Sequence, residues 1–210
     1  MIFNEHSKLK GLHAFLGASK YTWLNYDGVD QLFNSYKRQY AAAVGTSLHE
    51  IASDHIRLGF KITKRDQRSI LYELLKKGYS RNVIDMDSIF ENLSNFVNDA
   101  IGFQMQTEQI LYFSDNCFGT ADAISFDDNF LRIHDYKSGT IPAHMEQLDI
   151  YSALFCLEYK KNPNEIQIEE RIYQSNEVLY SNPDPSLIIS IMDKIITFDK
   201  MIERFKKEGA

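Results

Sequence analysis

The sequence predicts a mixed α/β (α+β) domain in which helices pack on a mixed β-sheet. Apolar residues recur at helical spacing through residues 1–104. Short segments rich in β-branched and aromatic residues, separated by turn signals, follow as far as Gly139. After them come the patterns of a helix, a strand and a final helix. At 210 residues the chain is most simply one domain over 1–210, with a mainly helical part over 1–104 and a sheet-containing core over 105–210.

In the first hundred residues, apolar side chains three and four positions apart predict amphipathic helices. Gly45 predicts a break in this pattern, followed by a helix that carries His49. The apolar positions that support these helices are Leu32, Tyr36 and Tyr40, then Leu48, Ala52 and Ile56, then Ile70, Leu71, Leu74 and Leu75, and finally Ile89, Leu93, Phe96 and Val97.

The period changes to that of strands after Glu108. The segments QILYF, CFGTADAISF and NFLRIHDYKSG predict a three-stranded meander. Helical spacing returns over residues 144–159, the segment EIQIEERIYQ reads as another strand, and residues 185–207 predict a closing helix. The order is therefore helices, three strands, a helix, a strand and a helix.

The second and third strands are joined by Asp128-Asn129, two residues that tolerate positive φ and predict a two-residue hairpin loop. In that register Asp127 pairs with Phe130. The residue numbers of antiparallel partners have a constant sum, so this first pair determines all the others. A loop one residue longer would shift every pair to a diagonal position. The register of the hairpin thus decides which side chains of the two strands face each other.

With this loop, Asp122 lies directly opposite Asp135 on one face of the sheet, with Cβ atoms about 5 Å apart. Lys137 projects from the same face, two residues further on. Two opposed carboxylates destabilise a sheet unless something compensates their charge, and oxygen-rich sites suit Mg²⁺ or Mn²⁺. The alternative is an ordinary pair of surface acids with Lys137 as their salt-bridge partner.

Further candidate ligands and contacts lie on the predicted helices. His49 offers an imidazole, although it is one of six histidines. Glu50 and Glu108 are additional carboxylates that could join a metal shell. Gln147 and Tyr151 lie four residues apart, on one face of the helix that follows the lysine strand; the alternative is a core tyrosine beside a polar border residue.

Composition narrows the class of protein. The net charge of −6 argues against nucleic-acid binding through bulk positive charge, but residues 1–81 carry 13 Lys/Arg against 7 Asp/Glu, and residues 82–210 carry 10 against 22. A polyanion-binding surface beside metal-binding carboxylates fits this division, and so do ordinary lysine-rich surface helices. Cys117 and Cys156 predict free thiols in a reducing cytoplasm and exclude a four-cysteine iron–sulfur cluster. The N-terminal segment lacks the pattern of a signal peptide, and we expect no membrane association.

Four short motifs occur in a fixed order within residues 45–151. They are "GTSLH" with Gly45 and His49, "GTAD" with Gly119 and Asp122, "DYK" with Asp135 and Lys137, and "QLDIY" with Gln147 and Tyr151. Together they resemble the PD-(D/E)XK nuclease superfamily, in its RecB-like branch of phage-type exonucleases that lack an iron–sulfur cluster. The resemblance implies a restriction-endonuclease-like core with the order αβββαβ.

The resemblance also implies an activity, a metal-dependent exonuclease that hydrolyses phosphodiester bonds at DNA ends. One or two Mg²⁺ or Mn²⁺ ions would be held by His49, Asp122, Asp135 and the backbone carbonyl of Tyr136. Lys137 would act on the attacking water or shield developing charge. By the same resemblance, Gln147 and Tyr151 would complete the catalytic site and contact DNA.

Nearer the N-terminus, "FLGASKYTWLNYD" is similar to the entry motif of phage-encoded members, in which Ser19 and Lys20 would approach the DNA backbone. The resemblance implies a cytoplasmic protein of a bacterium or a phage-infected host, acting on linear single- or double-stranded DNA in recombination or repair. The resemblance also allows a separate single-strand-annealing or helicase protein as partner. Any helicase would have to be a separate chain, because this chain has no G-x-x-x-x-G-K-[ST] ATPase loop. Tyr21, Trp23 and Tyr26 could stack on unpaired bases or pack the helical part.

Two other functions stay open from the residues alone. One is a non-catalytic DNA-end-binding or scaffold subunit of a recombination complex, for which Lys137 would have no use. The other is a metal-dependent hydrolase of a different phosphate ester. A basic cluster of Lys61, Lys64, Arg65 and Arg68 could bind successive phosphates of a DNA strand or form a solvated loop.

Overall fold

The computed structural model describes residues 7–9, 14–79, 86–139 and 142–209. The chain divides into two compact units, Met1–Ala43 and Val44–Ala210. Helix α1 (Val29–Leu58) begins in the first unit and continues into the second.

The first unit is a small helical assembly held by side chains around a short 3₁₀ segment, Ala18–Asn25. The indole Nε1 of Trp23 donates to the carbonyl of Gly17 at 3.2 Å, and the hydroxyls of Tyr26 and Ser35 are 2.7 Å apart. A one-turn 3₁₀ helix, Ser7–Leu9, precedes it. Tyr26 directly follows the 3₁₀ segment and Ser35 lies in α1, so the second contact joins these two elements.

The helix break predicted at Gly45 is wrong, since α1 runs through this residue without interruption. Glycine in a helix interior costs about 1 kcal/mol relative to alanine, so a tertiary contact must justify it. A Cβ atom at Gly45 would lie 2.8 Å from the Oγ of Ser138. The glycine therefore allows the chain after the third strand to approach the helix closely, next to His49.

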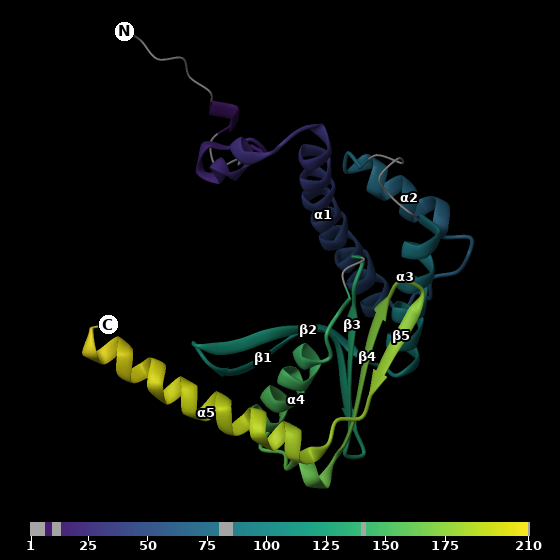
Figure 1. Ribbon diagram of the computed structural model, residues 1–210. Coiled ribbons are helices and arrows are strands. Elements are labelled where there is room, and N and C mark those ends of the chain that lie inside the picture. Colours follow the sequence, from purple (N-terminus) through teal and green to yellow (C-terminus); the bar gives the residue numbers. More distant parts are fainter. Residues whose placement is uncertain (1–6, 10–13, 80–85, 140–141, 210) are drawn as a thin grey trace. The chain divides into compact units, whose positions relative to one another are not determined.

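The second unit is a five-stranded mixed sheet with helices on both faces, which confirms the predicted fold class (Figure 1). The strands lie in sequence order; β3 and β4 are parallel and the other neighbouring pairs are antiparallel. The strands are β1 (Gln106–Ser114), β2 (Cys117–Asp127), β3 (Phe130–Tyr136), β4 (Gln167–Gln174) and β5 (Glu177–Ser181). The helices of this unit besides α1 are α2 (Gln67–Lys76), α3 (Met86–Gly102), α4 (Glu146–Glu158) and α5 (Pro185–Glu208), with a 3₁₀ turn at Pro163–Glu165.

The hairpin between β2 and β3 has the predicted register. Asp127 pairs with Phe130, and the loop residues Asp128 and Asn129 have φ values of 45° and 59°. Two consecutive residues with positive φ match the twist of antiparallel strands, as in a type I′ turn.

Strand β5 was not predicted from the sequence. It pairs with β4 through a tight turn at Ser175 and Asn176, whose φ values are 53° and 63°. The signal was the Ser-Asn pair before the short segment EVLYS, which is the same turn chemistry that identified the first hairpin.

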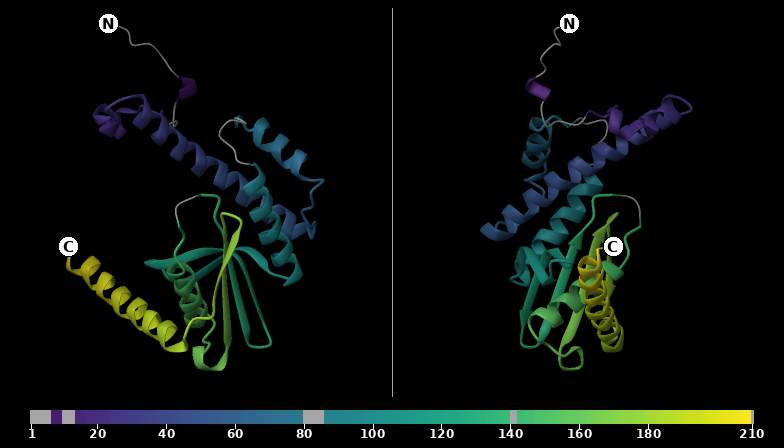
Figure 2. Two further views of the ribbon diagram at one scale, coloured as in Figure 1. Left: turned by 45° about the vertical axis from the view of Figure 1, so that its right-hand side comes forward. Right: turned by 90° about the vertical axis from the view of Figure 1, so that its left-hand side faces the viewer.

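Two layers of helix enclose the sheet (Figure 2). On one face, Phe96 of α3 contacts the rings of Tyr136 and Tyr173. On the other face, α4 buries Leu148, Leu154 and Phe155 in a core that includes Leu111, Ile124 and Ile133 of the strands. Burial of such apolar area is the main stabilising term in folding. None of the helices in the described residues is long and apolar enough to cross a membrane.

Candidate metal centre

The candidate site lies where β2 separates from β3. The two strands pair as far as Ala123 and His134. The next pair, Asp122 with Asp135, was predicted to lie directly opposite each other but is not part of this ladder. Instead, the backbone N–H of Tyr136 donates to Oδ2 of Asp122 at 2.9 Å, so a side-chain carboxylate accepts this hydrogen bond. The N–H of Lys137 donates to the carbonyl of Tyr173, which keeps β3 paired with β4. This divergence opens the sheet beside two of the predicted acids.

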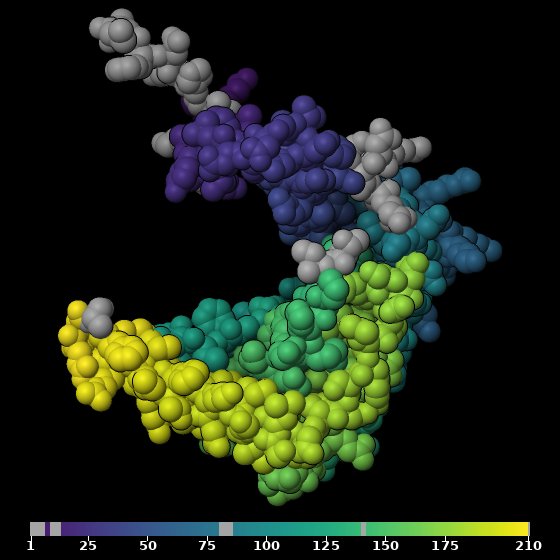
Figure 3. All heavy atoms as spheres, in the orientation of Figure 1, coloured from purple at the N-terminus to yellow at the C-terminus, as the bar shows by residue number. Residues whose placement is uncertain are grey.

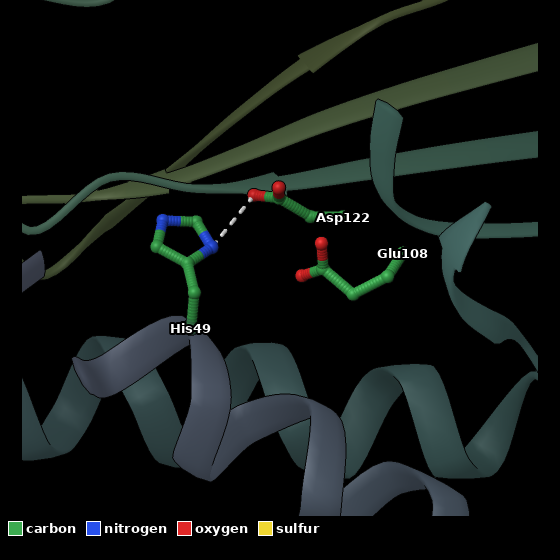
Figure 4. Close-up of side chains that lie close together, drawn as sticks. All are labelled: His49, Glu108 and Asp122. Atoms are coloured by element: carbon green, nitrogen blue, oxygen red, sulfur yellow. Dashed lines mark ion pairs between the residues drawn. The ribbon is translucent and has the colours of Figure 1, made fainter. Parts of the chain in front are cut away.

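Three potential metal ligands meet at this opening (Figure 4). One ligand atom from each of His49, Glu108 and Asp122 lies within 4.8 Å of the other two. The Nδ1 of His49 is 3.4 Å from Oδ2 of Asp122. The ligands come from α1, β1 and β2, so the group forms only when the helical and sheet-forming parts of this unit pack together.

Glu108 was one of two further carboxylates left open by the sequence, and its backbone explains its position. The β1–β2 register pairs the residues on either side of it, Thr107 with Ala123 and Gln109 with Ala121, and this places Glu108 opposite Asp122. Glu108 has a φ of 51°, which reverses the alternation of the strand. The Oγ1 of Thr107 is 2.9 Å from a serine hydroxyl of α1, so successive side chains of β1 face this helix.

The other candidate, Glu50, lies elsewhere: its carboxylate accepts from the ammonium of Lys77 at 2.5 Å. Glu50 follows His49 directly on α1, and successive helical side chains point about 100° apart.

The remaining predicted side chains form a connected chain beside this group. The Nζ of Lys137 lies 3.0 Å from Oδ2 of Asp135 and donates to Oε1 of Gln147 at 3.0 Å. The amide of Gln147 donates in turn to the hydroxyl of Tyr151 at 3.0 Å. Asp135 is bound to Lys137 and is not one of the three mutually close ligands. The ring of Tyr136 is buried and contacts the ring of His49 edge-on, at 5.4 Å between centroids.

Burial of the two aspartates disfavours their charged forms. The pKa of Asp122 and that of Asp135 are each raised to about 6, chiefly by desolvation, and at Asp135 the charge of Asp122 is the second cause. The N–H of Tyr136 and the charge of Lys137 oppose the shift at Asp122. Desolvation lowers the pKa of His49, which keeps its imidazole neutral and able to bind a metal through nitrogen.

These donors fit a divalent cation. Two carboxylates and a neutral imidazole are ligands that suit Mn²⁺ and, through the oxygens, Mg²⁺. Within the described part of the chain, the buried Oδ2 of Asp135 accepts no hydrogen bond of good geometry, although the Lys137 ammonium is close to it. A positive charge placed among His49, Glu108 and Asp122 would offset the cost of burying these anions.

Gly119 is required by a close contact on the opposite side of the hairpin. A Cβ atom at this position would lie 2.7 Å from Cε1 of Tyr151, which is closer than Cβ atoms come to other atoms in proteins. We expect Gly119→Ala to displace the Tyr151 ring and lower the free energy of unfolding by about 1–3 kcal/mol. Urea unfolding followed by circular dichroism would measure the change.

A double variant controls this prediction. If the clash is the cause, Gly119→Ala combined with Tyr151→Ala should cost less than the sum of the two single variants. Strictly additive costs would show that the glycine is needed for another reason.

The predicted DNA-contacting residues Ser19 and Lys20 lie in the first unit. They line a pocket of about 610 Å³ together with Trp23, Tyr26 and Arg38. No carboxylate is among the described residues that line it. Of the predicted basic cluster, Lys61, Lys64 and Arg65 lie in the loop before α2, and Arg68 lies in its first turn. None of these four residues is among the described residues that form the ligand group or the Lys137–Gln147–Tyr151 chain.

Neither the curated proteins nor the solved structures contain a match to this chain. One family model, described as "Protein of unknown function (DUF2800)", matches residues 13–174, which is more than half of the chain and includes every predicted site residue. The protein therefore belongs to the DUF2800 family.

Proposed function

We propose that this protein is a metal-dependent deoxyribonuclease, an exonuclease that hydrolyses phosphodiester bonds at DNA ends in phage or bacterial recombination or repair. The observation that carries the proposal is the meeting of His49, Glu108 and Asp122 at the gap between β2 and β3, with Asp135 and Lys137 beside them. A simple surface pair of acids would not require a histidine from α1 or a buried carboxylate.

The ligand residues have separate tasks in this proposal. His49, Glu108 and Asp122 would hold Mg²⁺ or Mn²⁺. The carboxylate of Asp135 and the backbone carbonyl of Tyr136, which are neighbours in the sequence, would supply further oxygen ligands. The ion, when bound, lowers the pKa of water and neutralises charge on a phosphate. The N–H of Tyr136 fixes the orientation of the Asp122 carboxylate by its hydrogen bond.

In this proposal Lys137 acts on the attacking water or on charge that develops at the phosphate. Its ammonium lies between the carboxylate of Asp135 and the amide oxygen of Gln147, both at 3.0 Å. Gln147 is itself held by Tyr151, so two residues of α4 determine where the ammonium points. Prepositioned charge of this kind supplies a large part of catalysis in phosphoryl transfer.

The first unit supports a role in DNA binding. Its pocket combines two cations, Lys20 and Arg38, with the aromatic side chains Trp23 and Tyr26. Cations neutralise phosphates, and aromatic rings stack on bases. In a chain with a net charge of −6, a pocket lined by cations without carboxylates favours an anionic ligand such as a DNA strand.

The proposal predicts that the purified protein degrades linear DNA when Mg²⁺ or Mn²⁺ is present and does not degrade it in EDTA. Without the ion, the group of two carboxylates and an imidazole has no positive charge that could neutralise the phosphate. End-labelled linear DNA and closed circular DNA, resolved on gels over time, would separate attack at ends from internal cleavage and establish its direction.

The same assay decides between the proposal and a non-catalytic role. Release of nucleotides from linear DNA alone is the expected result. DNA binding without cleavage over a broad range of metals and pH would instead indicate the DNA-end-binding or scaffold subunit. Degradation that is unchanged in EDTA would exclude the metal centre as the origin of activity.

A further inference from the structure

Helix α5 is attached to the rest of its unit along one side. In its first half, four apolar side chains lie in the core or pack against it: Ile188, Ile191, Met192 and Ile195. Its second half is fixed to the end of the β1–β2 hairpin, where Asp199 accepts hydrogen bonds from Ser114 and Asn116. These positions of α5 recur every three or four residues, so they form one side of the helix.

A second side of α5 carries an apolar stripe that is exposed. Four residues whose spacing places them on one face of a helix form this surface, the α5 stripe: Phe198, Met201, Ile202 and Phe205. Their side chains are 59%, 46%, 37% and 48% exposed. Figure 3 shows the yellow atoms of α5 at the surface of the molecule. Apolar residues gathered on one exposed face, rather than scattered singly, mark an interaction surface.

The α5 stripe has opposite charges at its two ends. Lys194 lies four residues before the first residue of the stripe, and Glu208 lies three residues after the last, so both continue the same face. Each is also seven residues, or about two helical turns, from Met201 at the centre. Both side chains are exposed, and Glu208 is paired with Arg204 of its own helix, a kind of contact that contributes little at a surface. The face therefore has an apolar centre, with a cation and an anion at equal distances on either side.

This pattern of charge indicates which partner fits the α5 stripe. Two such faces laid antiparallel about Met201 bring Lys194 of each helix level with Glu208 of the other. The apolar residues match as well, because Phe198 and Phe205 lie three and four residues from the same centre. A parallel pair would instead place lysine against lysine and glutamate against glutamate, which is unfavourable. The face is therefore complementary to a second copy of itself that is turned by a two-fold rotation.

We propose that the α5 stripe binds the α5 stripe of a second copy of this chain, in an antiparallel pair about a two-fold axis near Met201. Pairing removes four apolar side chains of each copy from water, which is the favourable term of association. Two ion pairs, each between Lys194 of one copy and Glu208 of the other, lie at the ends of the apolar contact and determine its direction. The metal ligands found among the described residues come from α1, β1 and β2, so this pairing does not rest on the proposed nuclease function.

The first test is the mass of the full chain as a function of its concentration, measured by sedimentation equilibrium. The wild type should associate to a dimer. Phe198→Ser and Phe205→Ser should each raise the dissociation constant of the dimer at least about tenfold, because each substitution occurs twice in the pair. Both side chains are about half exposed, so we expect the variants to fold, and circular dichroism would verify this. Tyr72→Ser, at an exposed aromatic residue of α2, is the matched control and should leave the dissociation constant unchanged.

An exchange of charges tests the direction of the pair without changing its apolar centre. Lys194→Glu and Glu208→Lys each bring like charges together at both ends, and each should raise the dissociation constant about 5- to 30-fold. The double variant restores opposite charges and should return to within about threefold of the wild type. Lys200→Glu alters the net charge as Lys194→Glu does, but it lies on the side of α5 away from the stripe and should have no effect.

Three outcomes would overturn the inference. A wild-type chain that remains monomeric at about 100 μM does not pair through α5. A dimer whose dissociation constant is unchanged in folded Phe198→Ser and Phe205→Ser is held by another surface. A double charge variant that stays as weak as the single variants contradicts the antiparallel direction. These measurements contain no DNA, so the nuclease proposal is decided separately by the degradation assay.

Discussion

Replacing Lys137 with methionine is expected to slow DNA degradation about 10³-fold, the effect of removing one prepositioned charge from an active site. The substitution keeps the length of the side chain and removes the ammonium that lies 3.0 Å from Asp135 and from Gln147. Asp122→Asn should have an effect of similar size, because it removes a negative charge from the ligand group but leaves an oxygen to accept from Tyr136. Initial rates on end-labelled linear DNA with Mn²⁺ measure both.

A matched control distinguishes catalysis from general loss of charge. Lys200 is an exposed lysine of α5, and Lys200→Met should degrade DNA at the wild-type rate. Circular dichroism and thermal unfolding should show that the Lys137 variant is folded. Wild-type activity in folded Lys137→Met would remove this residue from the mechanism, and equal losses in both lysine variants would indicate an effect of net charge.

The second large effect is expected in the pH dependence of the free energy of unfolding, and it arises from a carboxyl group that is buried beneath α4. Glu170 is fully buried on β4 and accepts from the hydroxyl of Ser152 at 2.7 Å. Its pKa is raised from 4.5 to about 8, chiefly by desolvation and in part by the neighbouring Asp149, whose own pKa is also raised by burial. At neutral pH the Glu170 carboxyl is therefore protonated in the folded protein and ionised in the unfolded chain.

The sign of the effect follows from proton binding. A raised folded pKa means that the folded state binds more protons than the unfolded state between pH 4.5 and about 8. Through Glu170, the free energy of unfolding is therefore highest below pH 4.5, and it falls as the pH rises toward 8. The slope is about 1.4 kcal/mol per pH unit, so the free energy of unfolding should fall by up to about 4 kcal/mol between pH 5 and pH 8 through this residue.

Glu170→Gln tests this prediction because the amide keeps the shape of the side chain and does not ionise. Urea unfolding at pH 5, 6, 7 and 8 should show a smaller decline of stability in the variant than in the wild type. Glu177→Gln at an exposed position of β5 is the control and should leave the wild-type slope unchanged. Parallel curves for wild type and Glu170→Gln would mean that the Glu170 carboxyl has similar pKa values in the folded and unfolded states.

Much of the fold was predictable because it depends on local chemistry. The Asp128-Asn129 turn determines the β2–β3 register by itself, since two residues that accept positive φ leave one way to join the strands. The closing helix is likewise confirmed, at Pro185–Glu208. The errors occur where distant contacts decide: a glycine lies inside α1 at position 45 because the close approach of Ser138 requires a residue without a side chain there.

The candidate site shows the same division. The sequence by itself determined which ionisable residues the chain has, and the turn that pairs β2 with β3 as far as Ala123 and His134, next to Asp122 and Asp135. Only the tertiary structure decided that Glu108 joins His49 and Asp122, because a positive φ at one residue of β1 reverses the side of the strand that its side chain faces. It also decided that Asp135 pairs with Lys137. Strand register follows from neighbours in sequence, whereas burial and charge pairing depend on what the rest of the chain packs against.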